Sequence, residues 1–390
     1  MASPSEQARF LLRNAVDAAP GGELEHQLEL GRPLRVKLGI DPTAPDIHLG
    51  HTVVLGKLRE FQDLGHDVVL IIGDYTGRVG DPSGRSAIRP ILSGEEIDRN
   101  AETYQRQAFT ILDPDRTEVR RNGEWLDMRA EDLFRLARHS TVAQLLARED
   151  FATRFRAQEP ISVLELLYPL LQGYDSVAIE SDVELGGTDQ LFNLLLGREV
   201  QQAYGIAPQS VITMPILPGT DGVQRMSKSA GNYVGVDEAP EEIFGKVMSI
   251  PDDVMPVWYT LLLDEELDPS RHPNESKREL ARRIVARFRG DDAAERAEAH
   301  FDRVFKEHEA PEEMPEVTLP GDDVVHLPAL LREAFGMSAS EARRLLGQGG
   351  VKVNGEALGG DVLDVGADSL DGAILQVGKR RFARLLRGRA

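Results

Sequence analysis

The stretch "GIDPTAPDIHLGH" (39–51) places two histidines, His48 and His51, three residues apart at the start of an apolar helical pattern. Residues three apart lie on one face of a helix. A helix N-terminus attracts anions, so two imidazoles there could donate hydrogen bonds to a phosphate group, and Gly50 lets a flat ring approach the backbone. A metal site would need a third ligand, and the chain has no cysteine to supply one. The pattern favours an anion site over a metal site and leaves ordinary packing as the alternative.

A second segment with chemical potential is "VQRMSKSAGN" (223–232), which is short, basic, polar and flanked by glycine. It follows a predicted strand. A mobile loop of this kind could close Arg225 and Lys228 over a triphosphate. Taken alone, the stretch is more typical of an ordinary solvated surface loop.

The elements around the first stretch form a βαβ pattern. "LRVKLGI" (34–40) alternates as a strand, and "DVVLIIGDYTG" (67–77) contains an apolar run that predicts a strand buried on both faces. The segment between them is apolar at helical spacing and ends at Gly65. Parallel sheets bind ligands at the carboxyl ends of their strands, where Asp41 and Asp74 stand.

The rest of the chain predicts an α/β protein built around a Rossmann-like parallel sheet. Ser93 and Glu96 form a possible capping box, and further strands are expected at 181–187 and 210–219. The pattern divides the chain into a catalytic domain at 1–234 with a mostly helical insertion at about 90–172, a helical domain at 235–309, a proline-rich acidic linker at 310–323, and a small basic unit of helices and strands at 324–390.

Composition narrows the classes of function. The 390 residues include no cysteine, which excludes disulfides, Cys-ligated zinc and thiol catalysis. No apolar run approaches a membrane span, and the first residues lack a secretory signal, so we expect a cytoplasmic protein. The net charge of −20 argues against nucleic acid, but residues 338–390 carry nine Lys and Arg against six Asp and Glu. Such a basic tail suggests a local nucleic-acid contact or merely a charged terminus that aids solubility.

Together these motifs resemble a known family. H-L-G-H and R-M-S-K-S, about 175 residues apart and in this order, resemble the two ATP-binding motifs of class I aminoacyl-tRNA synthetases. "YPLLQGYDS" (168–176), "GGTDQ" (186–190) and "GDPSGRS" (80–86) look like the tyrosyl-tRNA synthetases among them. The tail "MSASEARRLLGQGGVKVNGE" (337–356) resembles the S4 RNA-binding module of the bacterial members.

The resemblance implies a ligase with two steps. ATP, accompanied by Mg²⁺ as a substrate complex, would activate L-tyrosine to tyrosyl-adenylate, and the tyrosyl group would pass to the terminal ribose of tRNA(Tyr). No tightly bound cofactor or resident metal is expected, and catalysis would come from positioning and charge stabilisation. The family also implies a homodimer with its interface in the helical insertion and no membrane. A ligase for another aromatic amino acid and a non-catalytic RNA-binding paralogue are the alternatives.

The ATP side of the implied site joins both motifs. By resemblance, the histidines hold the triphosphate, the basic loop clasps the pyrophosphate end, and other positions line the adenylate. The catalytic set is His48, His51, Lys228, Arg225 and Thr43, and the ATP- and adenylate-binding set is Gly39, Asp41, Gly50, Asp189, Met226 and Ser227.

The amino-acid side must distinguish tyrosine from phenylalanine, which lacks one hydroxyl. A buried acceptor that phenylalanine leaves unpaired supplies that discrimination. The family places Asp175 against the phenol, and its spacing from Tyr168 and Gln172 puts all three on one helix face. A solvated polar stripe is the alternative for that helix. By resemblance, Asp81, Tyr168 and Gln172 match the positions that bind the ammonium group, and Gln190 matches a position near the substrate carboxylate and ribose. The tyrosine-binding set is Asp81, Tyr168, Gln172, Asp175, Gln190 and Lys37.

Lys37 departs from the family, because some members carry a tyrosine there that touches the phenol. We hypothesise that Lys37 pairs with Asp175 and keeps it ionised; the alternative is that it points elsewhere. Arg225 likewise replaces the first lysine of the usual loop motif, which keeps the charge and alters its geometry.

The basic tail is expected to bind the tRNA backbone, with little reading of bases. The helical region at 235–309 would lie near the anticodon, and a self-packed terminal cap is the alternative for the tail. The candidate phosphate contacts are Arg343, Arg344, Lys352, Lys379, Arg380, Arg381 and Arg384.

Overall fold

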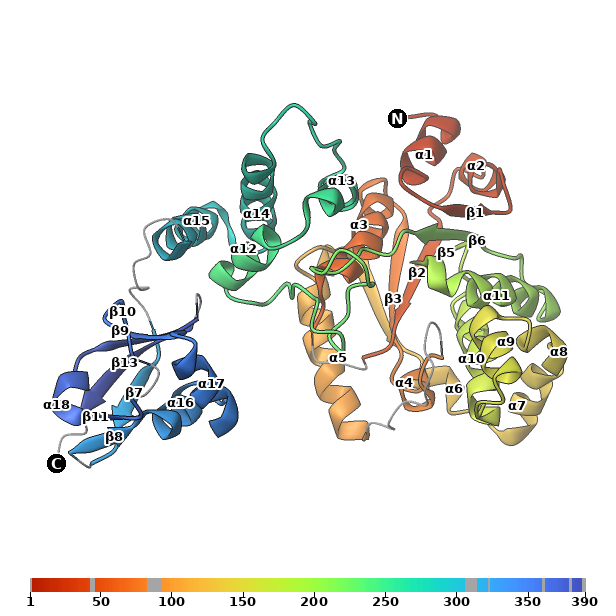
Figure 1. Cartoon of the computed structure of the whole chain (residues 1–390). Coiled ribbons are helices and arrows are strands. Elements are labelled where there is room, and N and C mark those ends of the chain that lie inside the picture. The colour runs from red at the N-terminus through yellow and green to blue at the C-terminus, as the bar shows by residue number, and fades with distance from the viewer. Residues whose placement is uncertain are drawn as a thin grey trace. The chain divides into compact units, whose positions relative to one another are not determined.

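The computed structural model describes residues 2–42, 46–82, 93–305, 314–321, 323–359, 362–378 and 381–387, with nothing stated for the side chain of Phe305. Thr43, Lys379, Arg380 and part of the 80–86 stretch lie outside these residues. The chain divides into two compact units, Met1–Ala294 and Glu295–Ala390 (Figure 1). Each unit is described separately.

The first unit is built on a six-stranded sheet in the order β1-β6-β5-β2-β3-β4. Five strands run parallel, and the short edge strand β1 is antiparallel to β6. From β2 the chain adds β3 and β4 on one side and later β5 and β6 on the other, so strand order reverses between β2 and β5. The strands are β1 (Asp17–Ala19), β2 (Arg35–Ile40), β3 (Asp67–Ile72), β4 (Thr117–Arg121), β5 (Val183–Gly187) and β6 (Ser210–Met214).

The predicted βαβ unit is confirmed. The helix α3 (Leu49–Asp63) joins β2 to β3, which pair in parallel, and the run Val68–Ile72 is buried as expected. Strands are found within both later stretches, as β5 and β6. Ser93 and Glu96 form both hydrogen bonds of a capping box, which opens α5 (Gly94–Ala108).

Two strands were not predicted. The stretch 90–172 is mostly helical as expected, but it also contains β4, which extends the sheet in parallel beside β3. The sequence of β4, "TEVRR", is half-exposed and charged at the sheet edge, so it carries no apolar signal. The stretch 310–323, expected as a linker, contains β7 (Glu316–Leu319), whose alternation buries Leu319.

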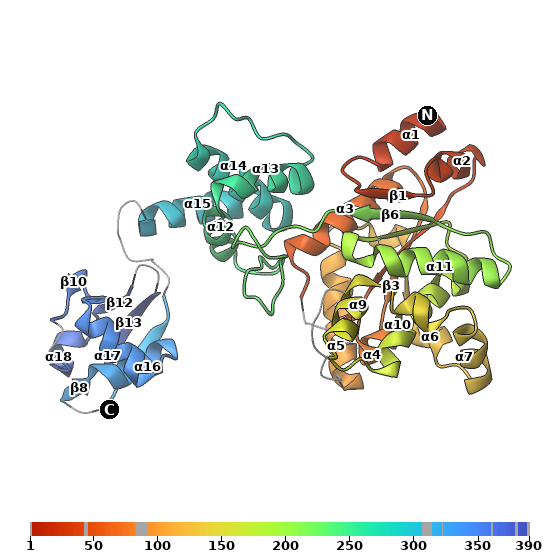
Figure 2. The same cartoon turned by 45° about the vertical axis from the view of Figure 1, so that its right-hand side comes forward.

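Helices cover both faces of the sheet, with α3 and α5 on one face and α10 and α11 on the other (Figures 1 and 2). Gly173 and Gly197 let α10 and α11 approach closely, because a Cβ on Gly173 would stand 3.2 Å from the Cα of Gly197. The α-helices of this unit besides α3 and α5 are α1 (Pro4–Leu11), α2 (Glu23–Glu29), α4 (Thr76–Val79), α6 (Gly123–Leu126), α7 (Ala130–Ala137), α8 (Val142–Leu145), α9 (Glu149–Arg156), α10 (Val163–Ala178), α11 (Leu191–Ala203), α12 (Pro240–Met248), α13 (Met255–Trp258) and α14 (Pro273–Arg289). The helix α15 (Asp291–Phe305) spans the boundary between the units.

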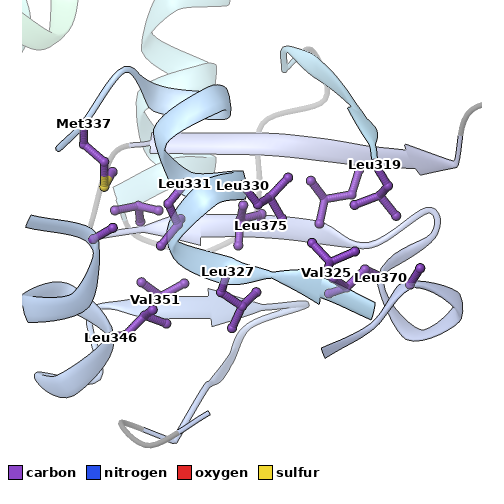
Figure 3. Packing of buried hydrophobic residues seen from close by; sticks show 14 residues of the cluster. Leu319, Val325, Leu327, Leu330, Leu331, Met337, Leu346, Val351, Leu370 and Leu375 are labelled. Carbon is purple, nitrogen blue, oxygen red and sulfur yellow. The ribbon is translucent and has the colours of Figure 1, made fainter. Parts of the chain in front are cut away.

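The second unit has its own apolar core (Figure 3). A five-stranded sheet, β10-β9-β12-β13-β7, packs against α16 and α17 around residues such as Leu331, Leu346 and Leu375, and β11 pairs with β8. The strands are β8 (Val324–His326), β9 (Val351–Val353), β10 (Glu356–Ala357), β11 (Asp364–Gly366), β12 (Ile374–Val377) and β13 (Arg381–Arg387), and the helices are α16 (Leu327–Phe335), α17 (Ala339–Gly347) and α18 (Ala367–Leu370).

Candidate active site

A cleft of about 550 Å³ opens at the carboxyl ends of β2, β3 and β5, where the strand order reverses. It brings together residues of both sequence motifs and of α10, so positions as far apart in the chain as Leu38 and Ser229 face one space. Lys37 does not line it. The candidate residues that do are Gly39, Asp41, His48, Gly50, His51, Asp81, Tyr168, Gln172, Asp175, Asp189, Gln190, Arg225, Met226, Ser227 and Lys228.

The two histidines lie together at the N-terminus of α3, with ring centroids 3.9 Å apart. Nδ1 of His48 accepts a hydrogen bond from the backbone N–H of Gly50, and Nδ1 of His51 accepts one from the backbone N–H of His48, each at 3.2 Å. A Cβ on Gly50 would stand 3.0 Å from the His48 ring, so the close approach favours glycine. Each ring therefore accepts through Nδ1 and, when neutral, carries its proton on Nε2.

Burial keeps both rings neutral. Desolvation, reinforced by the neighbouring His51 and Lys228, lowers the pKa of His48 to about 2. Desolvation and the charge of Lys228 lower the pKa of His51 to about 4, although its bond to the His48 backbone opposes this. At neutral pH the cleft thus holds two uncharged N–H donors beside the cation of Lys228.

The two motifs are joined through the backbone. The N–H of Leu49 donates to the carbonyl of Val234 at 2.9 Å, and the N–H of Val236 donates to the carbonyl of Ile47 at 3.0 Å. These bonds anchor the segment after the 223–232 loop to the start of α3. The loop is consequently held over the same end of the cleft as the histidines.

The two cations of the loop are paired with carboxylates that line the cleft. Nζ of Lys228 lies 3.1 Å from Asp46, and the guanidinium of Arg225 lies 3.1 Å from Asp189. Burial and the nearby Asp81 raise the pKa of Asp189, while Arg225 opposes the shift. The sequence analysis missed Asp46, although it stands two residues before His48.

The polar stripe of α10 faces the cleft, as its spacing predicted. The hydroxyl of Tyr168 donates to Asp41 at 2.8 Å, and the hydroxyl of Thr76 donates to the other oxygen of Asp41 at 2.7 Å. Gln172 and Asp175 follow along the same face. The alternative of a solvated stripe is therefore wrong.

Asp175 is the buried carboxylate of the site, with 3% of its surface exposed. Nε1 of Trp125 donates to one oxygen at 2.8 Å, and the amide of Asn122 approaches the other at 3.4 Å. Burial raises the pKa of Asp175 to about 7, and the charge of Lys37 opposes that rise. Sequence reasoning missed both donors, because they follow the edge strand β4 that it did not find.

Lys37 does not pair with Asp175, so that hypothesis was wrong. Its Nζ lies 2.9 Å from Glu184 and 3.3 Å from the backbone carbonyl of Gln172. The cause is strand register: Lys37 and Glu184 stand directly opposite each other on β2 and β5, and each is about 1% exposed. A single acidic residue in the otherwise apolar "VELGG" was the available signal.

The candidate phosphate contacts lie in the second unit. Arg343 and Arg344 are exposed on α17, Arg381 and Arg384 are exposed on β13, and Lys352 is half-buried on β9. Lys379 and Arg380 fall outside the described residues.

Among the described residues, no group of three or more His, Asp or Glu side chains could hold a metal ion. None of the helices described is long and apolar enough to cross a membrane.

Comparison with known families agrees with this geometry. The family of class I tRNA synthetases for tryptophan and tyrosine matches residues 29–306. The chain belongs to this family. It contains the motif pair, the switch-point cleft and the helical insertion within the matched residues.

Curated relatives cover nearly the whole chain and are named tyrosine–tRNA ligase. The relative from Geobacter sulfurreducens is 51% identical over 98% of this chain and 99% of its own. The relative from Thermotoga maritima is 51% identical over 99% of this chain and 98% of its own. The relative from Bordetella pertussis is 53% identical over 91% and 89%.

Solved structures show the same fold. A tyrosyl-tRNA synthetase from Archaeoglobus fulgidus, complexed with L-tyrosine, has a TM-score of 0.61 at 24% identity and covers 76% of this chain and 99% of its own. A C-terminally truncated mitochondrial tyrosyl-tRNA synthetase from Aspergillus nidulans has a TM-score of 0.63 at 20% identity. The match covers 78% of this chain and 95% of that one.

The neutral histidines predict a pH dependence of stability. Because their folded-state pKa values lie below 6.5, the unfolded chain binds protons first as the pH falls. Their contribution is fully present above pH 6.5 and is lost as the pH falls, until about pH 4 for His51 and about pH 2 for His48. Between pH 6.5 and 4 the loss is on the order of 3 kcal/mol for each ring. Urea unfolding at several pH values should therefore show a shallower acid loss in the double variant His48→Gln/His51→Gln.

The control is His26→Gln, which changes an exposed ring on α2. It should keep the wild-type slope of unfolding free energy against pH. Equal slopes for the wild type and the double variant would contradict the assignment of neutral rings.

Proposed function

We propose that the chain is a tyrosine–tRNA ligase, which couples L-tyrosine to tRNA(Tyr) with ATP. The proposal rests on one observation: the buried carboxylate of Asp175 lines the same cleft as the two ATP motifs. The names of the relatives support the amino acid, and the geometry supports the direction in which it would bind. Tyrosine would enter with its phenol toward Asp175 and its carboxylate toward the histidines.

In the first step a carboxylate oxygen of tyrosine attacks the α-phosphorus of ATP. A P–O bond forms, the bond to the leaving pyrophosphate breaks, and tyrosyl-adenylate results. The carboxylate is already ionised, so no protein base is required. The neutral Nε2–H groups of His48 and His51 would donate to the phosphate oxygens as charge develops. Mg²⁺ would arrive with ATP and neutralise part of that charge.

The cationic loop would act on the leaving group. Lys228 and Arg225 would exchange Asp46 and Asp189 for the phosphates of ATP, which carry more negative charge. Because these side chains are 20–36% exposed, their ion pairs with the carboxylates are weak and readily replaced. Asp189 would then be released to hydrogen-bond the ribose. Asp41, Gly39, Met226 and Ser227 would line the adenylate, and Thr43 stays a prediction of the sequence.

In the second step a hydroxyl of the terminal ribose of tRNA attacks the tyrosyl carbonyl carbon, and AMP leaves with the electrons of the C–O bond. The exposed arginines of α17 and β13 would contact tRNA phosphates. The support is their charge and exposure on a self-contained basic unit. We further propose that the enzyme works in the cytoplasm.

We propose a homodimer through the helical insertion. The support is a group of large apolar side chains that are exposed on α7, α8, α9 and α10. Such exposed apolar groups are typical of a surface that a partner protein covers. Their exposed fractions are high: Phe134 67%, Val142 61%, Phe155 56%, Val163 76% and Leu164 44%.

The activity is tested by ATP–pyrophosphate exchange. We expect exchange that depends on tyrosine and is at least about 10³-fold slower, as kcat/KM, with tryptophan or phenylalanine, since these leave Asp175 without its phenol partner. Exchange driven equally by tryptophan would assign a different substrate. Tyrosine-independent binding of tRNA without exchange would indicate a non-catalytic paralogue.

The role of Asp175 is tested by Asp175→Asn. Removing the charge leaves a neutral amide against the phenol, so we expect kcat/KM for tyrosine to fall by at least about 10²-fold and the preference over phenylalanine to shrink. The KM for ATP should stay near that of the wild type. Asp63→Asn, an exposed carboxylate of α3, is the matched control. An unchanged preference in Asp175→Asn would refute phenol recognition by this residue.

The dimer is tested by sedimentation of Phe134→Glu/Val163→Glu. The wild type should sediment at about twice the 43.1 kDa of the chain, and the variant as a monomer, because buried charges oppose the interface. Val223→Glu, which changes an exposed apolar residue outside the insertion, should stay dimeric. A wild type of 43.1 kDa in solution would contradict the proposal.

A further inference from the structure

Asn193 is a fully buried amide on α11, directly behind the cleft but not lining it. Its Oδ1 accepts a hydrogen bond from Arg148 at 3.0 Å. Its Nδ2 donates to Oε1 of Gln172 and to Oε1 of Gln190, each at 3.1 Å. One side chain thus contacts both glutamines of the amino-acid site.

Arg148 determines which way the Asn193 amide faces. A guanidinium only donates hydrogen bonds, so the atom of Asn193 that meets it must be the oxygen. Arg148 is itself 6% exposed and is held by an ion pair with Asp150. The amide nitrogen of Asn193 must therefore face the two glutamines, which present their oxygens to it.

Glu184 and Asp81, which accept from the nitrogens of the two glutamines, require the same orientation of the glutamine amides. Nε2 of Gln172 donates to Glu184 at 3.3 Å, and Nε2 of Gln190 donates to Asp81 at 2.9 Å. Ionised carboxylates only accept, so reversing either amide would set oxygen against oxygen at both of its ends. Arg148 on one side and the carboxylates of Glu184 and Asp81 on the other therefore determine the orientation of all three amides between them.

With the amides in this orientation, each glutamine keeps one hydrogen-bonding position for a ligand. A carbonyl oxygen has two acceptor positions, and Asn193 uses one on Gln172. An amide nitrogen has two hydrogens, and Asp81 takes one from Gln190. Both glutamines line the cleft. Gln172 can therefore accept from a cation, and Gln190 can donate to an anion.

We propose that Asn193, oriented by Arg148, is a positioning residue that makes the cleft complementary to the zwitterionic end of the amino acid. It aims the oxygen of Gln172 at the ammonium group and leaves an N–H of Gln190 for the carboxylate. The inference rests on the proposed function. Asn193 acts through the two glutamines and does not contact the substrate.

The test is Asn193→Asp, which keeps the shape and the contact with Arg148 but removes the N–H donors. A carboxylate oxygen of residue 193 would then face the oxygens of both glutamines, while Glu184 and Asp81 still accept from their nitrogens. This repulsion would displace the oxygen of Gln172 from the ammonium group and the free N–H of Gln190 from the carboxylate. We expect the Kd of tyrosine, measured by calorimetry, to rise roughly tenfold or more, the effect of losing one charge-assisted hydrogen bond.

The readout that separates positioning from general damage uses an analogue. 3-(4-Hydroxyphenyl)propionate is tyrosine without its amino group. The ratio of its Kd to that of tyrosine should fall roughly tenfold in Asn193→Asp, while the preference for tyrosine over phenylalanine, set at Asp175, stays unchanged. Asn193→Ser, which lacks the amide and adds no charge, should lower the same ratio.

The matched control is Gln201→Glu, another fully buried amide of α11, whose nitrogen donates to the backbone of Ser181 outside the cleft. It should reduce stability without changing the analogue ratio. A wild-type ratio in both Asn193 variants would overturn the inference and leave the proposed function intact. A wild-type protein that does not bind tyrosine would overturn the proposed function and the inference with it.

Discussion

The ion pair between Lys37 and Glu184 joins β2 to β5 where the order of the parallel strands reverses, and the cleft lies above it. Two charges buried this deeply are stable only when further hydrogen bonds satisfy them. Glu184 accepts from Gln172, Ser176 and Gln209 as well as from Lys37. The pair therefore holds α10 to the sheet, and its geometry determines how the polar face of α10 meets a ligand.

The two ends of the cleft use charge differently. At the end near Asp175 the polar side chains are hydrogen-bonded to one another, and desolvation raises the pKa of Asp175 to about 7. At the end near His48 and His51 the rings are neutral, and the cations stand on a loop where they pair with partly exposed carboxylates. Fixed groups suit the recognition of one side chain, and exchangeable cations suit a group that arrives as triphosphate and leaves as pyrophosphate.

Local patterns predicted much of the site. The spacing of His48 and His51, the alternation of β2 and the apolar run of β3 each arise within a few residues, and the helical spacing of Tyr168, Gln172 and Asp175 placed them on one face. The partners across the fold could not be predicted in this way. Lys37 meets Glu184 because of the register between strands 147 residues apart in the sequence, and Asn122 and Trp125 depend on β4, whose charged edge sequence resembles a loop.

A crystal structure of the wild type with L-tyrosine would show directly whether tyrosine binds to the switch-point cleft in the proposed orientation. We expect the phenol oxygen within about 3 Å of a carboxylate oxygen of Asp175 and the ammonium at hydrogen-bond distance from the oxygen of Gln172. Tyrosine bound with its phenol toward the histidines, or with the nitrogen of Gln172 facing its ammonium, would refute this orientation.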